Sequence, residues 1–267
     1  MNVFIVAAGK SKRFKDAKID TPKFLLKLNK KLLIENIFLN FDKKTKFSLI
    51  VNRKDFSNYK NEFNFLKKKY NNLKIYDIPS HNLGPAKSLS YLLHILEDNT
   101  LITYCDFLVE WDYKHFTRYC FDKEIVVPIF KGFQPASLGK NIYDYIKNFS
   151  NNKNQVSNIK VKEGFTKNRI NEPGVAGSYY FKNVKPLKSI LSTIKFTNKE
   201  IYLSHIIIKL LNQKHIIHSY KIEKFLCLGT PIDYYQYKNF ENNFNKKIQK
   251  KIIIDQMLIP MAGSGAR

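Results

Sequence analysis

The sequence predicts a doubly wound α/β fold on a mixed, mostly parallel sheet, and three observations carry that prediction. Short apolar runs typical of buried strands alternate with segments whose apolar residues recur at helical spacing. The helical segments between these runs are about ten to fifteen residues long, which suits crossovers between parallel strands. The first apolar run also ends at a glycine, and ligands in such sheets bind beyond the carboxyl ends of the strands.

The N-terminal part of the chain is expected to supply the parallel strands. Residues 3–8 are a continuous apolar run that predicts a strand buried on both faces. Further strands are expected at residues 47–51, 73–78 and 101–105. Helices are expected over residues 32–41, over 55–69 and over a segment with a single apolar stripe formed by Leu89, Leu92, Leu93 and Leu96.

The rest of the chain is expected to continue the same sheet with looser patterning. Strands are predicted at residues 124–129, at 177–181 and within 215–222, and a helix is predicted at 202–211. A polar, Asn-rich stretch at 150–154 falls within an inserted binding region. No linker divides residues 1–245, so we expect one domain over residues 1–250.

Composition limits the partners that this chain can have. The 46 Lys and Arg residues against 22 Asp and Glu residues give a formal net charge of +24, which attracts phosphorylated molecules and other polyanions. The three cysteines, Cys105, Cys120 and Cys227, form no CxxC pair, so they indicate neither a disulfide framework nor a zinc site. No run of about 18 apolar residues predicts a membrane span. We therefore expect a cytoplasmic protein with no membrane partner.

A basic glycine loop follows the first expected strand. It consists of Ala7, Ala8, Gly9, Lys10, Ser11, Lys12 and Arg13. Backbone N–H groups and cations on such a turn can converge on phosphate oxygens. The loop is neither a Walker A loop nor a GxGxxG dinucleotide fingerprint, because GxxxxGK[ST] does not occur and a serine stands at the second glycine. Taken alone, the segment is also compatible with a basic surface turn.

A Pro-Lys pair further along the chain makes the loop more specific. Residues 21–26 read TPKFLL, with Lys23 after the proline. An AAGxSxRF loop followed by a PK pair resembles the signature of nucleotidyltransferases that join a nucleoside triphosphate to a sugar 1-phosphate or an alcohol phosphate. The resemblance implies that the loop wraps the triphosphate and that Arg13 and Lys23 neutralise charge on its phosphates. It also implies the Rossmann-like fold of nucleotide-diphospho-sugar transferases.

An aspartate stands directly after the fourth expected strand. Asp106 follows LITYC at the sheet edge where a ligand is expected, and a carboxylate there suits Mg²⁺. The family has an aspartate at this point, and YCDFLVEWDY resembles the corresponding stretch of bacterial surface-polysaccharide (capsule) enzymes. Glu110 and Asp112 are close in sequence, but Asp112 is better placed to cap a helix that starts at YKHF.

The resemblance extends to about residue 237 and implies further site residues. Gly84 and Ala86, at the start of the leucine-striped helix, are expected to lie against the nucleobase or ribose. Lys162 falls where the family places a lysine that binds the acceptor phosphate, and Glu172 and Gly177 flank the expected acceptor pocket.

One position departs from the family pattern. Sugar nucleotidyltransferases often carry a second metal-binding aspartate two residues before the GT of FLCLGT, where this chain has Cys227. A thiol is a poor Mg²⁺ ligand. Asp106 is then expected to hold the ion with phosphates and water, or with another carboxylate.

These features together predict a magnesium-dependent nucleotidyltransferase. It would couple an NTP of unspecified base to a phosphorylated small molecule and release pyrophosphate, in surface polysaccharide synthesis. A metal-dependent glycosyltransferase using Glu110 and Asp112 is one alternative, but it leaves Arg13 and Lys23 unexplained. A non-catalytic nucleotide- or nucleic-acid-binding module is the other. Nucleic acid is disfavoured because the aromatic residues fall mostly within apolar strands and helices, not among the basic clusters.

The end of the sequence repeats its beginning. VFIVAAGKSKR at residues 3–13 and MLIPMAGSGAR at residues 257–267 share Ile, Ala, Gly and Arg at equivalent positions. The second copy cannot form a site by itself, because no Pro-Lys pair follows it. We therefore expect residues 251–267 to be a connector and the start of a second nucleotidyltransferase domain in the same chain.

Overall fold

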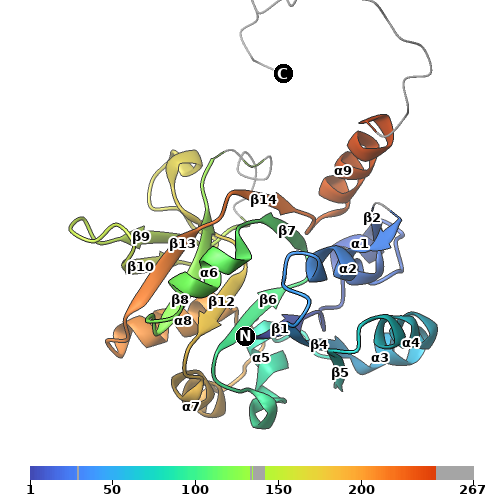
Figure 1. Ribbon diagram of the computed structural model, residues 1–267, viewed down its shortest axis with the longest axis horizontal. Coiled ribbons are helices and arrows are strands. Elements are labelled where there is room, and N and C mark those ends of the chain that lie inside the picture. Colours follow the sequence, from blue (N-terminus) through green and yellow to red (C-terminus); the bar gives the residue numbers. More distant parts are fainter. Residues whose placement is uncertain (29, 133, 135–141, 245–267) are drawn as a thin grey trace, which may run out of the picture.

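A computed structural model describes residues 1–28, 30–132, 134 and 142–244, and its centre is one ten-stranded sheet (Figure 1). The strand order is β10-β9-β11-β8-β12-β6-β1-β4-β5, with β13 beside β8. These strands are β1 Asn2–Val6, β4 Lys46–Asn52, β5 Leu73–Ile78, β6 Thr100–Tyr104, β8 Ile125–Phe130, β9 Tyr145–Asn148, β10 Val156–Lys160, β11 Gly174–Val175, β12 Ser178–Phe181 and β13 Ile217–Lys221. Two small sheets join β7 (Phe107–Glu110) to β14 (Lys224–Cys227) and β2 (Lys27–Leu28) to β3 (Lys31–Leu32).

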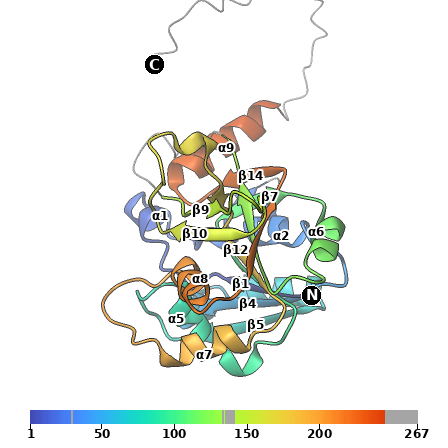
Figure 2. The same cartoon turned by 90° about the vertical axis from the view of Figure 1, so that its left-hand side faces the viewer.

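Helices cover both faces of the sheet (Figure 2). They are α1 Lys12–Asp16, α2 Leu33–Phe38, α3 Arg53–Asn58, α4 Lys60–Lys69, α5 Pro85–Ser90, α6 Tyr113–Tyr119, α7 Lys185–Thr193, α8 Leu203–Asn212 and α9 Pro231–Phe244, with 3-10 turns at Lys23–Leu25, Leu93–Ile95 and Arg169–Asn171. Val3 and Ile5 of β1 pack into a core with α1, α2, α4 and α6, whereas Phe4 and Val6 pack into a second core with α5, α7 and α8. Because successive side chains of a strand point to opposite faces, β1 contributes to both cores. The prediction of a strand buried on both faces is confirmed.

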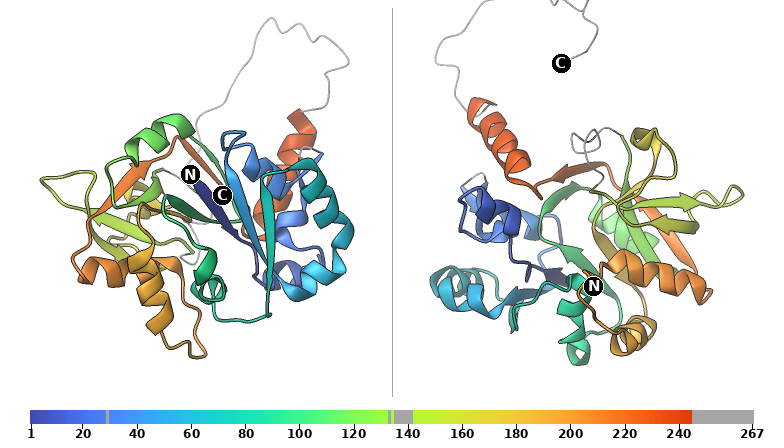
Figure 3. Two further views of the ribbon diagram at one scale, coloured as in Figure 1. Left: turned by 60° about the horizontal axis from the view of Figure 1, so that its bottom comes forward. Right: turned by 180° about the vertical axis from the view of Figure 1, so that it is seen from behind.

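The sheet has two halves of different character. In the parallel half, β1 pairs in parallel with β4 and β6, and β4 pairs in parallel with β5. In the mixed half, β8 to β12 join through antiparallel pairs and β13 runs parallel to β8. The antiparallel pair of β12 with β6 joins the halves, which extend to opposite sides of β6 in Figure 3. The predicted doubly wound α/β fold with a mixed sheet is confirmed.

Several predicted elements differ in extent from the observed ones; the helix expected over residues 32–41, for example, is observed only at Leu33–Phe38. The helix expected over residues 55–69 is two helices, because α3 begins earlier, where the Asn52 side chain accepts from the Asp55 amide at 2.8 Å, and the chain leaves helical geometry at Tyr59. The leucine-striped helix ends at Ser90 and continues only as a 3-10 turn. The strand expected at residues 3–8 ends at Val6, although the Ala7 amide still donates to the Ile50 carbonyl of β4.

The last described element is α9. Residues 245–267, which contain most of the predicted connector and second domain, lie outside the described residues. Within the part of the chain that the structure describes, no helix combines the length and the apolar character needed to cross a bilayer.

Candidate active site

The glycine loop forms a tight turn between β1 and α1. The Ala7 amide donates to the carbonyl of Ile50 at 2.8 Å, which fixes the start of the turn. Ser11 has a φ of 51° and stands at the N-cap of α1, where its carbonyl accepts from the amide of Phe14 at 2.9 Å. Because Phe14 is buried, the end of the turn is fixed as well, while Gly9 and the basic side chains remain exposed.

The Pro-Lys segment lies against this turn and reaches the end of β6. Lys23 begins a 3-10 turn after Pro22, and its amide donates to the Ser11 hydroxyl at 3.4 Å. Its ammonium group donates to a carboxylate oxygen of Asp106 at 2.8 Å. The side chains of this pair are only 19% and 31% exposed. Residues far apart in the sequence thus meet at the carboxyl edge of β1 and β6.

The ion pair keeps the Lys23 ammonium charged. Burial acts most strongly on the pKa of Lys23 and lowers it, but the charge and hydrogen bond of Asp106, with a contribution from Cys105, outweigh burial and raise the pKa above its ordinary value. The nearby charge of Arg13 opposes this rise. A permanent positive charge therefore lies next to the glycine loop over the whole physiological pH range.

The charge of Arg13 acts on both Lys23 and Tyr202. The pKa of Tyr202 is raised, first by burial and then by the hydrogen bond and charge of Glu200, and the positive charge of Arg13 opposes that rise. Since Arg13 also acts on Lys23, its guanidinium lies within electrostatic range of both groups.

Cys227, the last residue of β14, lies close to Asp106. The strand pairing sets Cys227 opposite Phe107, and the amide of Leu228 donates to the carbonyl of Asp106 at 2.8 Å. A point at the Cβ position of Gly229 is 3.5 Å from both the thiol and the Asp106 carboxylate. Burial and the charge of Asp106 raise the pKa of Cys227 to about 11, so the thiol is protonated at neutral pH.

Asp106 is the carboxylate that the structure offers to a divalent cation. Within residues 1–28, 30–132, 134 and 142–244, no three His, Cys, Asp or Glu side chains gather into a metal-binding group. Mg²⁺ commonly binds through one or two carboxylates together with substrate phosphates and water. The donor set at Asp106 fits this kind of binding, in which the substrate completes the coordination.

Gly177 packs against Tyr104 and Phe107, which flank Asp106 in the sequence. It has a φ of 66° and separates β11 from β12, so the strand bends there. A Cβ on Gly177 would lie 2.5 Å from the Phe107 ring, and the Gly177 carbonyl accepts from the Tyr104 amide at 3.1 Å. Gly177 thus allows the close approach of Phe107, and its predicted contact with the acceptor stays a prediction.

The turn before α5 carries the two residues predicted to contact the nucleoside. Gly84 has a φ of 83°, and a Cβ there would lie 2.7 Å from backbone atoms of Ile201. The Ile201 amide donates to the carbonyl of Leu83 at 2.9 Å, and the Ala86 amide donates to the Ile201 carbonyl at 3.1 Å. Ala86 is fully buried and its amide is already used, so any nucleoside contact at this turn falls to the rest of the turn.

Lys162 and Glu172 occupy different settings. The Lys162 ammonium lies 2.5 Å from the Tyr202 hydroxyl and 4.0 Å from the centre of its ring. The buried Glu172 carboxylate accepts from the amides of Phe165 at 2.7 Å and Thr166 at 2.5 Å. Burial raises the pKa of Glu172, but these bonds and that of the Thr166 hydroxyl outweigh burial and lower it. Glu172 therefore fixes a loop, and its predicted role beside the acceptor pocket stays untested.

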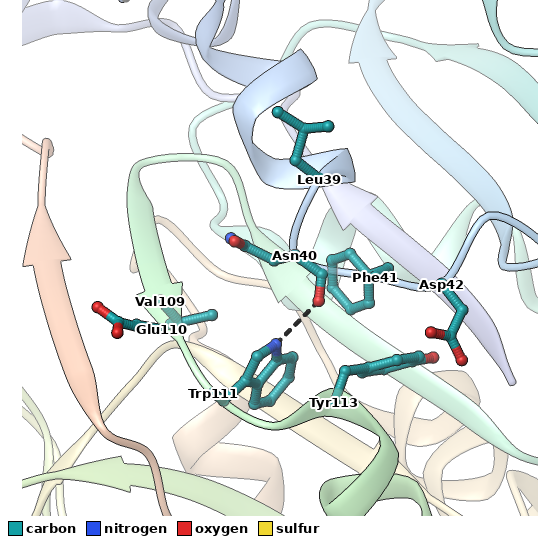
Figure 4. Close-up of a pocket in the computed structure, with 8 residues that line it drawn as sticks. All are labelled: Leu39, Asn40, Phe41, Asp42, Val109, Glu110, Trp111 and Tyr113. Atoms are coloured by element: carbon teal, nitrogen blue, oxygen red, sulfur yellow. Dashed lines mark hydrogen bonds between the residues drawn. The ribbon is translucent and has the colours of Figure 1, made fainter.

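The acidic pair of the glycosyltransferase alternative lies at the far end of β7. Asp112 caps α6 by accepting from the His115 amide at 2.9 Å, as predicted, and Glu110 pairs with Lys224 at 2.7 Å. Glu110 also borders an open aromatic hollow between the end of α2 and the start of α6, where the Trp111 indole donates to the Asn40 carbonyl at 3.0 Å (Figure 4). This hollow contains none of the other predicted site residues.

Three polar residues near Lys162 escaped prediction. Asp144 accepts from the Lys162 amide, Tyr202 accepts from its ammonium group, and Glu200 accepts in turn from the Tyr202 hydroxyl. Asp144 stands just before β9, and a carboxylate at such a strand end is a weak signal that the sequence does offer. Nothing in the local sequence distinguishes Glu200 and Tyr202 from other residues of a helix start.

Comparison with known proteins places this architecture among nucleotidyltransferases. No protein-family model matches the sequence, and no curated protein matches it. Among solved structures, a nucleoside-diphosphate-sugar pyrophosphorylase from Vibrio cholerae is 16% identical with a TM-score of 0.70, covering 90% of this chain and 100% of that one. An inositol-1-phosphate CTP transferase from T. maritima is 16% identical with a TM-score of 0.69, covering 90% and 96%. A CTP:phosphocholine cytidylyltransferase from Streptococcus pneumoniae is 16% identical with a TM-score of 0.65, covering 90% and 98%. The chain has the fold that these nucleotidyltransferases share.

Proposed function

We propose that this protein transfers a nucleotidyl group from an NTP to a phosphorylated small molecule and releases pyrophosphate. The ion pair of Lys23 with Asp106 beside the glycine loop carries this proposal. It unites the loop, the Pro-Lys pair and the aspartate after β6, the three sequence features that resemble nucleotidyltransferases. The shared fold of solved nucleotidyltransferases supports the same reaction class.

The reaction needs charge and positioning more than covalent chemistry. An oxygen of the acceptor phosphate forms a new bond to the α-phosphorus, and the bond from that phosphorus to the β-phosphate oxygen breaks, so that pyrophosphate leaves. The acceptor phosphate is already ionised near neutral pH, so a strong general base is not needed. Arg13 and Lys23 would stabilise negative charge that builds up around the α-phosphorus, and Lys162 would orient the acceptor.

We also propose that Mg²⁺ binds at Asp106. When bound, such an ion would neutralise negative charge on the substrate phosphates. Lys23 holds one oxygen of the Asp106 carboxylate, which leaves the other oxygen for a cation. Cys227 stays a protonated thiol beside it and adds no hard ligand.

A pyrophosphate-release screen tests the function directly. CTP, UTP, dTTP and GTP are each combined with sugar, polyol and alcohol phosphates in the presence of Mg²⁺. We expect release with one pairing, and we expect Lys23→Ala to reduce its rate by about a hundredfold or more. Lys224→Ala, which removes a lysine from an exposed ion pair at the far end of β7, is the matched control and keeps full activity.

Two other assays could favour one of the alternative functions instead. Transfer from an intact NDP-sugar without pyrophosphate exchange would indicate the glycosyltransferase. Salt-steep RNA binding without NTP turnover would indicate the nucleic-acid module. If Lys23→Ala kept the fold and released pyrophosphate at the native rate, the proposed site would be wrong.

The biological setting extends this proposal. The resemblance of residues 104–113 to capsule enzymes supports a product used in surface polysaccharide synthesis. The cysteines of the described residues are free thiols, which supports a cytoplasmic location. Deleting the gene and measuring surface polysaccharide and the pool of activated nucleotides tests this setting.

A further inference from the structure

The backbone of Lys162 is held in an unfavourable conformation by a partly buried carboxylate. Lys162 has a φ of 54°, which a residue with a Cβ seldom adopts. Its amide donates to one oxygen of Asp144 at 2.9 Å, and the Ser204 hydroxyl donates to the other oxygen at 2.5 Å. Ser204 in turn shares a hydrogen bond of 2.7 Å with the buried Tyr179. The turn at Lys162 is therefore fixed from the core of the mixed half and not by its own loop.

The side chain of Lys162 is held by a second set of contacts. Its ammonium donates to the Tyr202 hydroxyl at 2.5 Å and lies 4.0 Å from the ring centre. The Tyr202 hydroxyl donates to Glu200, and the ring stacks on His205 with centroids 5.8 Å apart and planes 25° apart. A lysine side chain is flexible, and these contacts restrict it to one region.

Tyr202 is itself anchored to the nucleotide side of the site. The preceding residue, Ile201, exchanges backbone hydrogen bonds with Leu83 and Ala86 at the turn before α5. Arg13 lies within electrostatic range of the Tyr202 hydroxyl. The Tyr202 hydroxyl thus contacts Lys162 and also lies within electrostatic range of Arg13, while the residue before Tyr202 is tied to the turn before α5.

We propose that Asp144 and Tyr202 are positioning residues that hold Lys162 ready for the acceptor phosphate. The inference rests on the proposed function, because it concerns the lysine that would bind the acceptor in that reaction. Asp144 sets the direction of the side chain through the backbone. Tyr202 with Glu200 provides the resting position of the ammonium, from which it moves a short way to the phosphate. Preorganisation of this kind lowers the entropy that binding must remove.

Steady-state kinetics with the acceptor found in the screen measure the effect. Tyr202→Leu removes the ring and hydroxyl contacts, and we expect the acceptor KM to rise about fivefold. Asp144→Ala removes the bond to the Lys162 amide, and we expect a rise of about tenfold, most of which Asp144→Asn restores because its side-chain oxygen still accepts. The KM for the NTP stays unchanged in all three variants, which a general loss of folding would not produce.

Two control variants remove equivalent contacts elsewhere. Tyr180→Phe deletes the neighbouring hydroxyl of β12, which donates to Asn99 at 3.0 Å on the opposite face of the sheet. Glu124→Gln neutralises a carboxylate that, like Asp144, accepts from a backbone amide, that of Ile216 at 3.2 Å. Both controls keep the native KM for the acceptor. Equal acceptor KM values in Tyr202→Leu, Asp144→Ala and these controls would overturn the inference.

A spectroscopic readout separates this inference from the proposed function. In protein labelled with ¹³C and ¹⁵N at lysine, the Lys162 signal is identified by its absence in Lys162→Arg. We expect its side-chain protons to be shifted upfield by the Tyr202 ring, to lose that shift in Tyr202→Leu, and to move when inorganic phosphate is added. Absence of all pyrophosphate release would refute the proposed function, whereas a Lys162 signal indifferent to Tyr202→Leu and to phosphate would refute the positioning role.

Discussion

The parallel half and the mixed half hold their functional turns in different ways. In the parallel half, the glycine loop is fixed by backbone hydrogen bonds such as that from Ala7 to Ile50, and its exposed charges need no side-chain support. In the mixed half, two carboxylates, the partly buried Asp144 and the buried Glu172, fix the turns around residues 162–166. A site made by the backbone tolerates side-chain variation, whereas a site held by carboxylates depends on single residues and on their ionisation. In the proposed reaction, this difference would suit an NTP bound at the glycine loop and an acceptor bound near Lys162.

The largest effect is expected where the two halves meet, at Asp106. Asp106→Asn keeps the shape of the side chain but removes the charge that pairs with Lys23 and that would bind Mg²⁺. We expect the rate of pyrophosphate release to fall by about a hundredfold or more, with the midpoint of thermal unfolding nearly unchanged. Asp122→Asn, which breaks an exposed pair with Lys123, is the control. Native activity in Asp106→Asn would show that the active site does not lie at this junction.

A pair of glycine substitutions tests the backbone of the parallel half. Gly84→Ala places a Cβ 2.7 Å from the Ile201 backbone at a φ of 83°, and we expect a loss of about 2–4 kcal/mol in the free energy of unfolding. Gly9→Ala meets nothing within 4 Å, so its stability stays close to native. Urea unfolding of both variants measures the difference. Equal stabilities would mean that the contact between Ile201 and the turn is dispensable.

The mixed half is expected to be sensitive to acid through Glu172. Its pKa is lowered in the folded protein, so the stabilisation is complete above the ordinary pKa near 4.5 and is lost as the pH falls below it. At pH 7 we expect Glu172→Gln to lose about 1–2 kcal/mol of unfolding free energy. The difference between variant and native protein should shrink when urea unfolding is repeated at lower pH. A difference that stays constant down to pH 3 would contradict the role of the ionised carboxylate.

The smallest effect concerns Cys227. Because the pKa of its thiol is raised to about 11, alkylation by iodoacetamide at pH 7.5 should be much slower than that of a free cysteine and should accelerate as the pH rises. Cys227→Ser supplies the background from the other two thiols and should change the reaction rate less than about twofold, since the thiol adds no metal ligand. Rapid labelling at neutral pH would show a thiolate beside Asp106.

The sequence by itself determined the parallel half and its charged turn. Apolar runs fix where strands form, and a strand buried on both faces needs no knowledge of its partners. The same local logic located the Asp112 cap and set Lys23 and Asp106 at ends of elements that must share one sheet edge.

Only the tertiary structure decided how Lys162 is held. Its contacts with Asp144 and Tyr202 span 18 and 40 positions in the chain, and no periodicity encodes such a pairing. The antiparallel order of the mixed half, the bend at Gly177 and the close approach of Ile201 to Gly84 likewise depend on which segments pack together. Local sequence specifies conformations along the chain, whereas side-chain contacts across it are selected only once the core has formed.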